Sequence, residues 1–458
     1  MQVPLLDLSK QLDPLRDEII EAVTEVIDST AYILGPRVER LEDEIAAYCG
    51  GGIGIGVASG TDALLAALMA LGVGPGDLVL TTPYSFFATM GCIVRLGATP
   101  LFVDIDPVSF NIDPDKIDEA LAMDPARTAK IKLILPVHLY GQCADMERIM
   151  AVSRRYNIPV LEDAAQAIGA SCPITDNGAT SWHRAGNIGT AGCFSFFPSK
   201  NLGGIGDGGM VITRDEALAE LIRIIRVHGG APKYHHKIIG GNFRLDPIQA
   251  AVLSVKLPHL DSWHEARRDN ADLYGRLFSR KGLGDFIIQP RAVYRAAAEL
   301  LEPVPDFHIY NQYVIRAKDR DGLLAFLVNE GIGVEIYYPI PLHKQKCLEE
   351  LGYNDLSFPE AEKAAAETLA LPIYPEMTDS MQEYVVDRIA ARVLVRERLY
   401  IGQGAAAFLH RVCRGSLRAT VFGASGLHVA WHRIERRRCR GAGRCAHGTP
   451  DPGPDAAR

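Results

Sequence analysis

Residues 193–204 read Cys-Phe-Ser-Phe-Phe-Pro-Ser-Lys-Asn-Leu-Gly-Gly, and Gly206-Asp207-Gly208-Gly209 follows one residue later. This stretch places one lysine, Lys200, between an aromatic run typical of a strand and a loop dense in glycine. Glycines let a planar group approach the backbone and the lysine amine. The apolar run lowers the pKa of an ammonium, which frees the amine to attack a carbonyl. Lys200 is therefore a candidate Schiff-base lysine; the alternative is a surface lysine in a glycine turn.

The composition is that of an ordinary globular protein, since 48% of the 458 residues are hydrophobic and 23% are charged. The length favours two to three domains. No apolar run of about 18 residues is present, so we expect no membrane partner. The first ten residues lack a basic region followed by an apolar core, which favours a cytoplasmic location. The nine cysteines contain no Cys-x-x-Cys pair, so we expect free thiols and no metal site.

Charge is distributed unevenly along the chain. Residues 396–458 contain 12 arginines, no lysine and four acidic residues, whereas the first 395 residues contain 36 basic and 52 acidic residues. The acidic body makes a nucleic-acid partner unexpected. The Arg/Gly/Ala-rich tail, residues 394–458, is predicted to be poorly ordered and foreign to the fold, as frameshifted translation would produce. A nucleic-acid-binding tail is the alternative.

Short apolar segments alternate with helical patterns between Ile53 and Asp163. This alternation predicts an α/β fold whose mostly parallel sheet is sandwiched by helices. Ligands of such sheets bind beyond the carboxyl ends of the strands. The segments 83–86, 138–142 and 163–166 follow predicted strands and are thus candidate parts of a site. The predicted strands are 53–57, 78–81, 100–103, 131–137 and 159–161.

The predicted domain organisation has three parts: an N-terminal segment with a large domain (1–257), a small α+β domain (258–393) and the tail (394–458). Strands at 310–315 and around 334–338, and helices at 321–329, 359–369 and 380–391, are predicted for the small domain. Residues 171–189 are interpreted as a polar surface loop near the site.

Pyridoxal phosphate requires an imine-forming lysine, a carboxylate for its ring nitrogen, a phosphate cup and an aromatic ring over its face. Asp163, at a predicted strand end 37 residues before Lys200, is placed to serve the ring nitrogen. Ser59-Gly60-Thr61-Asp62 opens a helix whose free amides bind an anion. Ser195 adds a hydroxyl and Phe86 a stacking ring. A turn-forming aspartate, a plain helix cap and a core phenylalanine are the alternatives for the single residues.

Eight motifs follow one another along the chain: Ser59–Leu64, Val103–Asp106, His138–Gln142, Glu162–Gln166, Phe194–Asn201, Gly206–Gly209, Gly241–Asp246 and Tyr338–His343. Together they resemble the DegT/StrS family of nucleotide-sugar aminotransferases. The likeness covers nearly all of residues 1–392 and none of the tail. The resemblance implies a pyridoxal-phosphate-dependent transferase of fold type I that works as a homodimer.

The resemblance also implies roles for single residues. Lys200 and Asp163 would be catalytic, Gln166 would lie against the cofactor ring, and Phe86 would stack on it. Asn242 would reach the cofactor phosphate of the neighbouring subunit. Gly60, Thr61, Asp62 and Ser195 would hold the phosphate, and Tyr338 and His343 match a motif near the sugar pocket. The chain departs from the family at Gly240-Gly241 and in a longer 171–190 loop.

The resemblance implies a reaction that moves an amino group from an amino acid, glutamate by the same resemblance, to a keto-sugar of a nucleoside-diphosphate sugar. Lys200 would shuttle the proton. A sugar dehydratase of the same family is an alternative, but that branch replaces the lysine by histidine. A non-catalytic sensor or scaffold would not need Lys200, Asp163 and Gln166 together. A lyase would need an arginine for a carboxylate, with Arg244 the nearest candidate.

Overall fold

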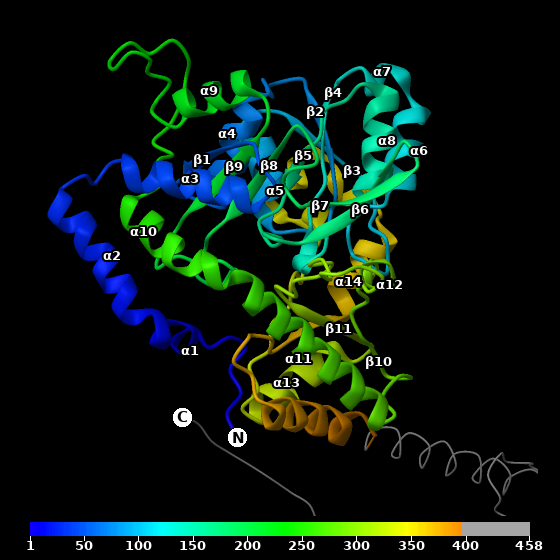
Figure 1. Ribbon diagram of the computed structural model, residues 1–458. Helices are drawn as coiled ribbons and strands as arrows, with labels where there is room; N and C mark the ends of the chain where they lie inside the picture. Colours follow the sequence, from blue (N-terminus) through cyan, green and yellow to red (C-terminus); the bar gives the residue numbers. More distant parts are fainter. Residues whose placement is uncertain (395–458) are drawn as a thin grey trace, which may run out of the picture. The chain divides into compact units, whose positions relative to one another are not determined.

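The computed structural model describes residues 1–394, shown as the coloured part of Figure 1. The predictions for the tail from residue 395 onward lie outside the described residues. No helix within residues 1–394 is long and apolar enough to cross a membrane. The six cysteines of this part are free thiols, five of them buried. The longer helices are α2 (Arg16–Ser29), α3 (Pro36–Tyr48), α4 (Gly60–Ala70), α5 (Phe87–Arg95), α6 (Pro114–Met123), α8 (Met146–Tyr156), α9 (Glu216–Ile225), α10 (Pro247–Lys256) and α11 (Leu260–Arg280).

The main sheet combines a four-stranded and a three-stranded ladder. Isolated parallel bridges from Ile134 to Val160 and from Val137 to Asp163 join β4 to β5, so the order is β1-β9-β8-β5-β4-β2-β3. Only β9 runs antiparallel to its neighbours, which confirms the predicted mostly parallel sheet. The strands are β1 (Ile53–Val57), β2 (Leu78–Thr81), β3 (Thr99–Phe102), β4 (Ile131–Leu135), β5 (Leu161–Asp163), β8 (Ala191–Ser195) and β9 (Gly209–Thr213).

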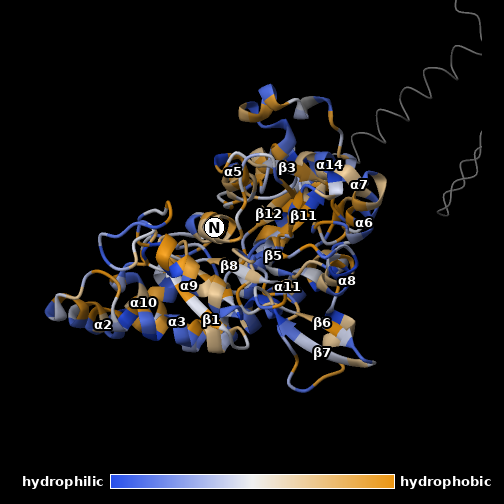
Figure 2. Cartoon of the chain, turned by 90° about the horizontal axis from the view of Figure 1, so that it is seen from above, coloured by the Kyte–Doolittle hydropathy of each residue, from blue (hydrophilic) through white to orange (hydrophobic). Residues whose placement is uncertain are grey.

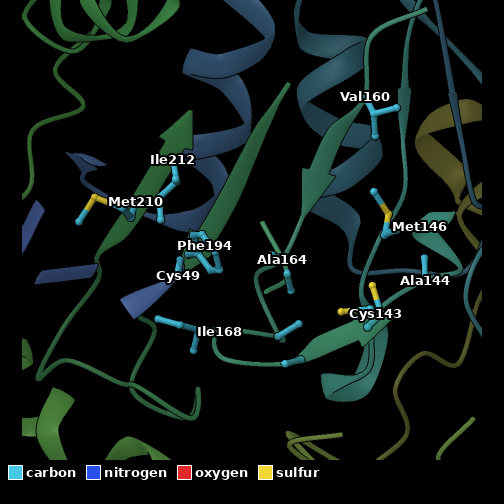
Figure 3. Close-up of a cluster of buried hydrophobic side chains, with 14 of the residues drawn as sticks. Cys49, Cys143, Ala144, Met146, Val160, Ala164, Ile168, Phe194, Met210 and Ile212 are labelled. Atoms are coloured by element: carbon cyan, nitrogen blue, oxygen red, sulfur yellow. The ribbon is translucent and has the colours of Figure 1, made fainter. Parts of the chain in front are cut away.

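Both faces of this sheet are buried. Successive side chains of a strand point to opposite faces, so neighbouring residues of β9 enter two different apolar clusters. Met210 and Ile212 of β9 lie with Phe194 of β8 in one apolar cluster, together with Cys49 beyond α3 (Figure 3). Val211 lies in a second cluster with residues of α4, α5 and α9. Near-continuous apolar strands are what such two-sided burial requires. Helix α2 lies along α10 and buries an apolar stripe on it (Figure 1).

A second, antiparallel sheet lies towards the C-terminus in the order β10-β11-β12. It has its own apolar cluster, and Figure 2 shows β11 and β12 as hydrophobic strands. The elements are β10 (Ile287–Ile288), β11 (Tyr313–Ala317), α13 (Arg320–Asn329), α14 (Pro359–Glu367) and β12 (Thr368–Leu371), followed by a helix at 379–394. The short helices are α1 (Leu8–Leu12), α7 (Pro125–Thr128) and α12 (Arg295–Ala298).

Two predictions for this region are wrong. The strand expected around 334–338 is only an isolated bridge between Glu335 and Ala370. The helix expected to reach residue 369 ends at Glu367, since Thr368 is extended and begins β12. β12 pairs with β11 from Thr368 onward, which ends the helix at Glu367. Residues 334–338 meet the other edge of β12 only at Glu335, whose N–H and carbonyl both bond to Ala370.

The predicted loop at 171–189 is wrong as well, because most of it is a β-hairpin. Strands β6 (Ser171–Asp176) and β7 (Ala179–Arg184) pair along their whole length. Asn177 and Gly178 form the turn with positive φ angles of 50° and 79°. An Asn-Gly pair between two strands is a strong hairpin signal.

Candidate active site

A cavity of about 470 Å³ lies where β5 and β8 end and α4 begins. It collects side chains from segments far apart in the sequence. Eight of the predicted site residues line it: Gly60, Thr61, Phe86, Asp163, Gln166, Ser195, Lys200 and Tyr338. The order of the strands explains this meeting, because β5 and β8 are parallel neighbours whose carboxyl ends share one edge of the sheet.

Lys200 lies in a turn directly after β8, where its main-chain N–H donates to the carbonyl of Phe197 at 2.8 Å. Burial lowers the pKa of its amine to about 8, and the charge of Asp163 opposes this shift. An amine with this pKa is partly neutral near pH 7, and the neutral form is the nucleophile.

Asp163 is almost fully buried at the end of β5. Its Oδ2 accepts a hydrogen bond from Thr89 Oγ1 at 2.8 Å, and Oδ1 accepts one from the N–H of Ala165 at 3.2 Å. Burial raises the pKa of the carboxyl, while these bonds and the charge of Lys200 lower it. The two donors therefore favour the carboxylate form inside an apolar setting.

Thr89 was missed by the sequence reasoning, and so was its neighbour Ser85. The two hydroxyl oxygens are 2.8 Å apart. Because the single hydroxyl proton of Thr89 goes to Asp163, Ser85 is the donor to Thr89. Thr89 lies in the first turn of α5, and Ser85 precedes the N-cap residue Phe86, so the turn into the helix brings the two hydroxyls together.

Gln166 has a fixed orientation, because the main-chain N–H of Tyr140 donates to its Oε1 at 2.8 Å. Its Nε2 then faces Tyr338 and donates to the phenol oxygen at 3.1 Å. Burial raises the pKa of Tyr338 above its usual value, so the phenol keeps its proton. That proton remains available to an acceptor in the cavity.

The turn into α4 forms another wall. Ser59 Oγ accepts the N–H of Asp62 at 3.0 Å and caps the helix. A Cβ on Gly60 would lie 2.6 Å from Cβ of Ser195, so only glycine fits there. Asp62 does not line the cavity, and burial raises the pKa of its carboxyl.

The predicted role of the glycine-dense loop is wrong. A Cβ on Gly203 would lie 2.3 Å from the carbonyl oxygen of Pro198, and one on Gly209 would lie 2.4 Å from that of Ser59. These glycines permit close contacts within the protein, and none of them lines the cavity.

Three further predicted features lie outside the cavity. Asn242 is exposed and forms an isolated bridge with Val227. His343 is buried, with Nε2 3.1 Å from Glu362 Oε1. The hairpin β6–β7 does not line the cavity either; Arg184 at its end donates to the carbonyl of Gly169 at 2.7 Å, so the interpretation of a loop near the site is corrected.

Comparison with known proteins adds the decisive observation: the profile of the DegT/DnrJ/EryC1/StrS aminotransferase family matches residues 13–390. The chain belongs to this family. It is 51% identical over 390 residues to a protein of Geobacillus stearothermophilus called pleiotropic regulatory protein, covering 85% of this chain and 98% of the relative.

Two further members of the aminotransferase family have informative names. The UDP-N-acetyl-3-dehydro-alpha-D-glucosamine 3-aminotransferase of Acidithiobacillus ferrooxidans is 39% identical over 398 residues, covering 87% of this chain and 98% of the relative. The crystal structure of S. venezuelae DesV in complex with a ketimine intermediate superposes with a TM-score of 0.75 at 37% identity, covering 85% of this chain and 98% of that chain. The DegT-family fold, including the α/β sheet predicted above, is therefore shown.

Proposed function

We propose that this chain is a pyridoxal-phosphate-dependent aminotransferase that moves the amino group of an amino acid, glutamate in our prediction, to a keto-sugar of a nucleoside-diphosphate sugar. The observation that carries the proposal is the presence of Lys200 and Asp163 in one cavity of an aminotransferase-family chain. The amine has a pKa of about 8, and the carboxylate is buried and held by two donors.

The residues of the cavity fit pyridoxal phosphate. Gly60 lets the start of α4 lie close to Ser195, so the first amides of α4 and the serine hydroxyl would together hold the phosphate. Phe86 lines the cavity, and its side chain is 55% exposed. One face of its ring is therefore open for stacking on the planar cofactor. When bound, the cofactor would supply an electron sink for the negative charge that develops on carbon.

The chain's own groups perform the proton transfers and the orientation. Lys200 Nζ holds or releases a proton near neutral pH, which suits a general acid and base. Asp163 places a negative charge at the end of β5, and Ser85 and Thr89 hold its orientation. Gln166 and Tyr338 form a polar wall with a fixed pattern of donors. We assign the keto-sugar to that wall, since the Tyr338 phenol lines the cavity and burial, which raises its pKa, keeps its proton in place.

The nucleotide-sugar substrate is proposed because relatives at 37–39% identity carry such names, among them the UDP-sugar 3-aminotransferase reported above. The family relative named as a regulatory protein keeps a second candidate open, a sensor with the same fold. The assembled Lys200 and Asp163 favour the catalyst, since a sensor has no need of a nucleophilic amine. The same lysine counts against a dehydratase.

A homodimer is part of the proposal. Asn242 is exposed and outside the cavity of its own chain, so it is free to serve the site of a second copy. Apolar side chains that are more than half exposed stand near the cavity and on the Asn242 segment, which is unusual for a surface that stays in water. They are Phe86, Phe197, Ile205, Tyr234 and Ile239.

Two experiments test the function. Purified protein with pyridoxal phosphate should show a visible absorbance band that glutamate bleaches and that Lys200→Ala abolishes. A band that survives in Lys200→Ala would refute the lysine assignment. For the dimer, mixing inactive Lys200→Ala and Asn242→Ala subunits should restore activity, because one site of each hybrid has both residues. Failure of the mixture to regain activity, although mass spectrometry detects hybrids, would refute the contribution of Asn242.

A further inference from the structure

A second cavity, of about 100 Å³, adjoins the first one. Ser199, Gln312 and Tyr337 line both cavities, so the two spaces share a wall directly beside Lys200. Arg267 of α11 and Leu6 of the N-terminal segment line only the second cavity. The function proposed above leaves this space without a role.

Arg267 stands out among the buried arginines of the described residues. The other three each pair with a carboxylate: Arg226 with Glu42, Arg316 with Glu367 and Arg320 with Asp321. Arg267 is only 3% exposed, yet within residues 1–394 no carboxylate lies within 4 Å of it.

Within residues 1–394 the hydrogen bonds of Arg267 use only one of its nitrogens. Nη1 donates to the carbonyls of Tyr310 at 3.0 Å and Ile373 at 2.8 Å. Burial lowers the pKa of the guanidinium to about 10, with Glu376 acting against this from a distance. The group stays charged at neutral pH and is buried without a counter-ion, which is costly. A guanidinium with free N–H groups in a cavity is suited to a carboxylate.

Gln312 provides an independent observation at the shared wall. Its Oε1 is buried and has no hydrogen-bond partner in the described part of the chain. Buried polar atoms nearly always have a partner, so an unpaired carbonyl oxygen beside a cavity indicates a ligand with an N–H donor. An anion alone would not satisfy it.

We propose that Arg267 and Gln312 form the amino-donor site, a deeper statement that rests on the proposed aminotransferase function. Arg267 pairs with the α-carboxylate, and Gln312 Oε1 accepts a hydrogen bond from the α-amino group. An α-amino acid carries both groups on one carbon, and Gln312 reaches both cavities, so the amino group faces the space that contains Lys200. The keto-sugar does not need to pair a carboxylate with Arg267, so it occupies the larger cavity.

The substitution Gln312→Glu tests the site most directly. The new carboxylate stands beside Arg267, where it pairs with the guanidinium and repels the donor. We expect the glutamate concentration for half-maximal bleaching of the cofactor band to rise by about tenfold to a hundredfold. Gln312→Leu removes only the neutral acceptor, and its rise should be about threefold to tenfold. Gln2→Glu, the same change at an exposed position, serves as the charge control and should leave both half-reactions unchanged.

The comparison of half-reactions makes the result specific. The effect of Gln312→Glu on recovery of the band with a keto-sugar nucleotide should be at least tenfold smaller than its effect on bleaching by glutamate. The wild type should also prefer glutamate to 4-aminobutyrate, which lacks an α-carboxylate, and Gln312→Glu should lose that preference. An unchanged glutamate dependence in Gln312→Glu, or equal slowing of both half-reactions, overturns the donor site while the aminotransferase stands. A wild-type protein whose band glutamate does not bleach overturns both.

Discussion

The amine of Lys200 should titrate far below an exposed lysine in the cofactor-free protein. Burial lowers its pKa from 10.5 to about 8. At pH 7 about a tenth of the amine is then neutral, whereas a lysine of pKa 10.5 has roughly 0.03% neutral amine. The reactive fraction differs by about 300-fold. The effect belongs to the cavity and needs no bound cofactor.

Reductive methylation at pH values from 6 to 10, read by mass spectrometry of the Lys200 peptide, measures this titration. Lys116 is the internal control, because it is exposed and its bond to Glu119 raises its pKa. Labelling of Lys200 should reach half its maximal rate near pH 8, and that of Lys116 only above pH 10. Asp163→Asn removes the charge that opposes the shift, so the midpoint should fall further. Equal midpoints for the two lysines would refute the reasoning.

The stability of the cofactor-free protein should follow the same titration. Between about pH 8 and pH 10.5 the unfolded chain binds a proton on this lysine that the folded chain has released. Stability contributed by this group therefore rises with pH across that window. Lys200→Met, which has no titrating group, should remove this part of the slope in urea unfolding curves measured at several pH values.

Three further substitutions test the surroundings of the cavity. Gly60→Ala should weaken cofactor binding in equilibrium dialysis by about tenfold or more, because its methyl group meets a serine side chain, while Gly74→Ala, in open space, should have no effect. Thr89→Val should lower kcat/KM by about tenfold to a hundredfold, and Thr89→Ser should restore most of it. Glu162→Gln should lower the free energy of unfolding by about 3 kcal/mol, because the new amide NH2 would face main-chain N–H donors. The control Glu349→Gln, at an exposed position, should leave the free energy of unfolding almost unchanged.

Much of the main sheet could be predicted because its information is local. The segment Ile53–Val57 is apolar and is bounded by a glycine cluster and a helix cap, and the structure has β1 with the same bounds. The segment 334–338 also alternates apolar residues around Glu335, yet it forms only one bridge, to Ala370 at the open edge of β12. How far a segment follows the edge of its partner strand depends on packing between distant parts of the chain. Local pattern does not contain that information.

In the candidate site, too, some residues could be predicted from local sequence and others only from the folded chain. Lys200 and Asp163 stand in recognisable segments at strand ends, so the order of motifs was enough to place them in one hypothesis. Thr89 could not be singled out from the sequence, because its bond to Asp163 joins segments that lie 74 residues apart. Arg267 could not be found from the sequence, because its distinguishing property is the lack of a counter-ion, which is a property of the folded chain.

The glycines after Lys200 acquire a different meaning from the structure. They allow segments of the chain to pack closely on one another. Gly209 lets β9 begin against the carbonyl of Ser59, and the amine of Lys256 donates to the carbonyl of Gly203 at 2.5 Å. The loop that follows Lys200 is thus held by a side-chain bond at Gly203 and by a close main-chain contact at Gly209. A nucleophile on a flexible loop would lose part of its advantage to disorder, whereas one on a braced turn keeps its distance to the reacting carbon. In the proposed reaction the glycine-dense stretch therefore serves to fix the position of Lys200, and Gly60 on the opposite wall likewise permits a close contact, with Ser195.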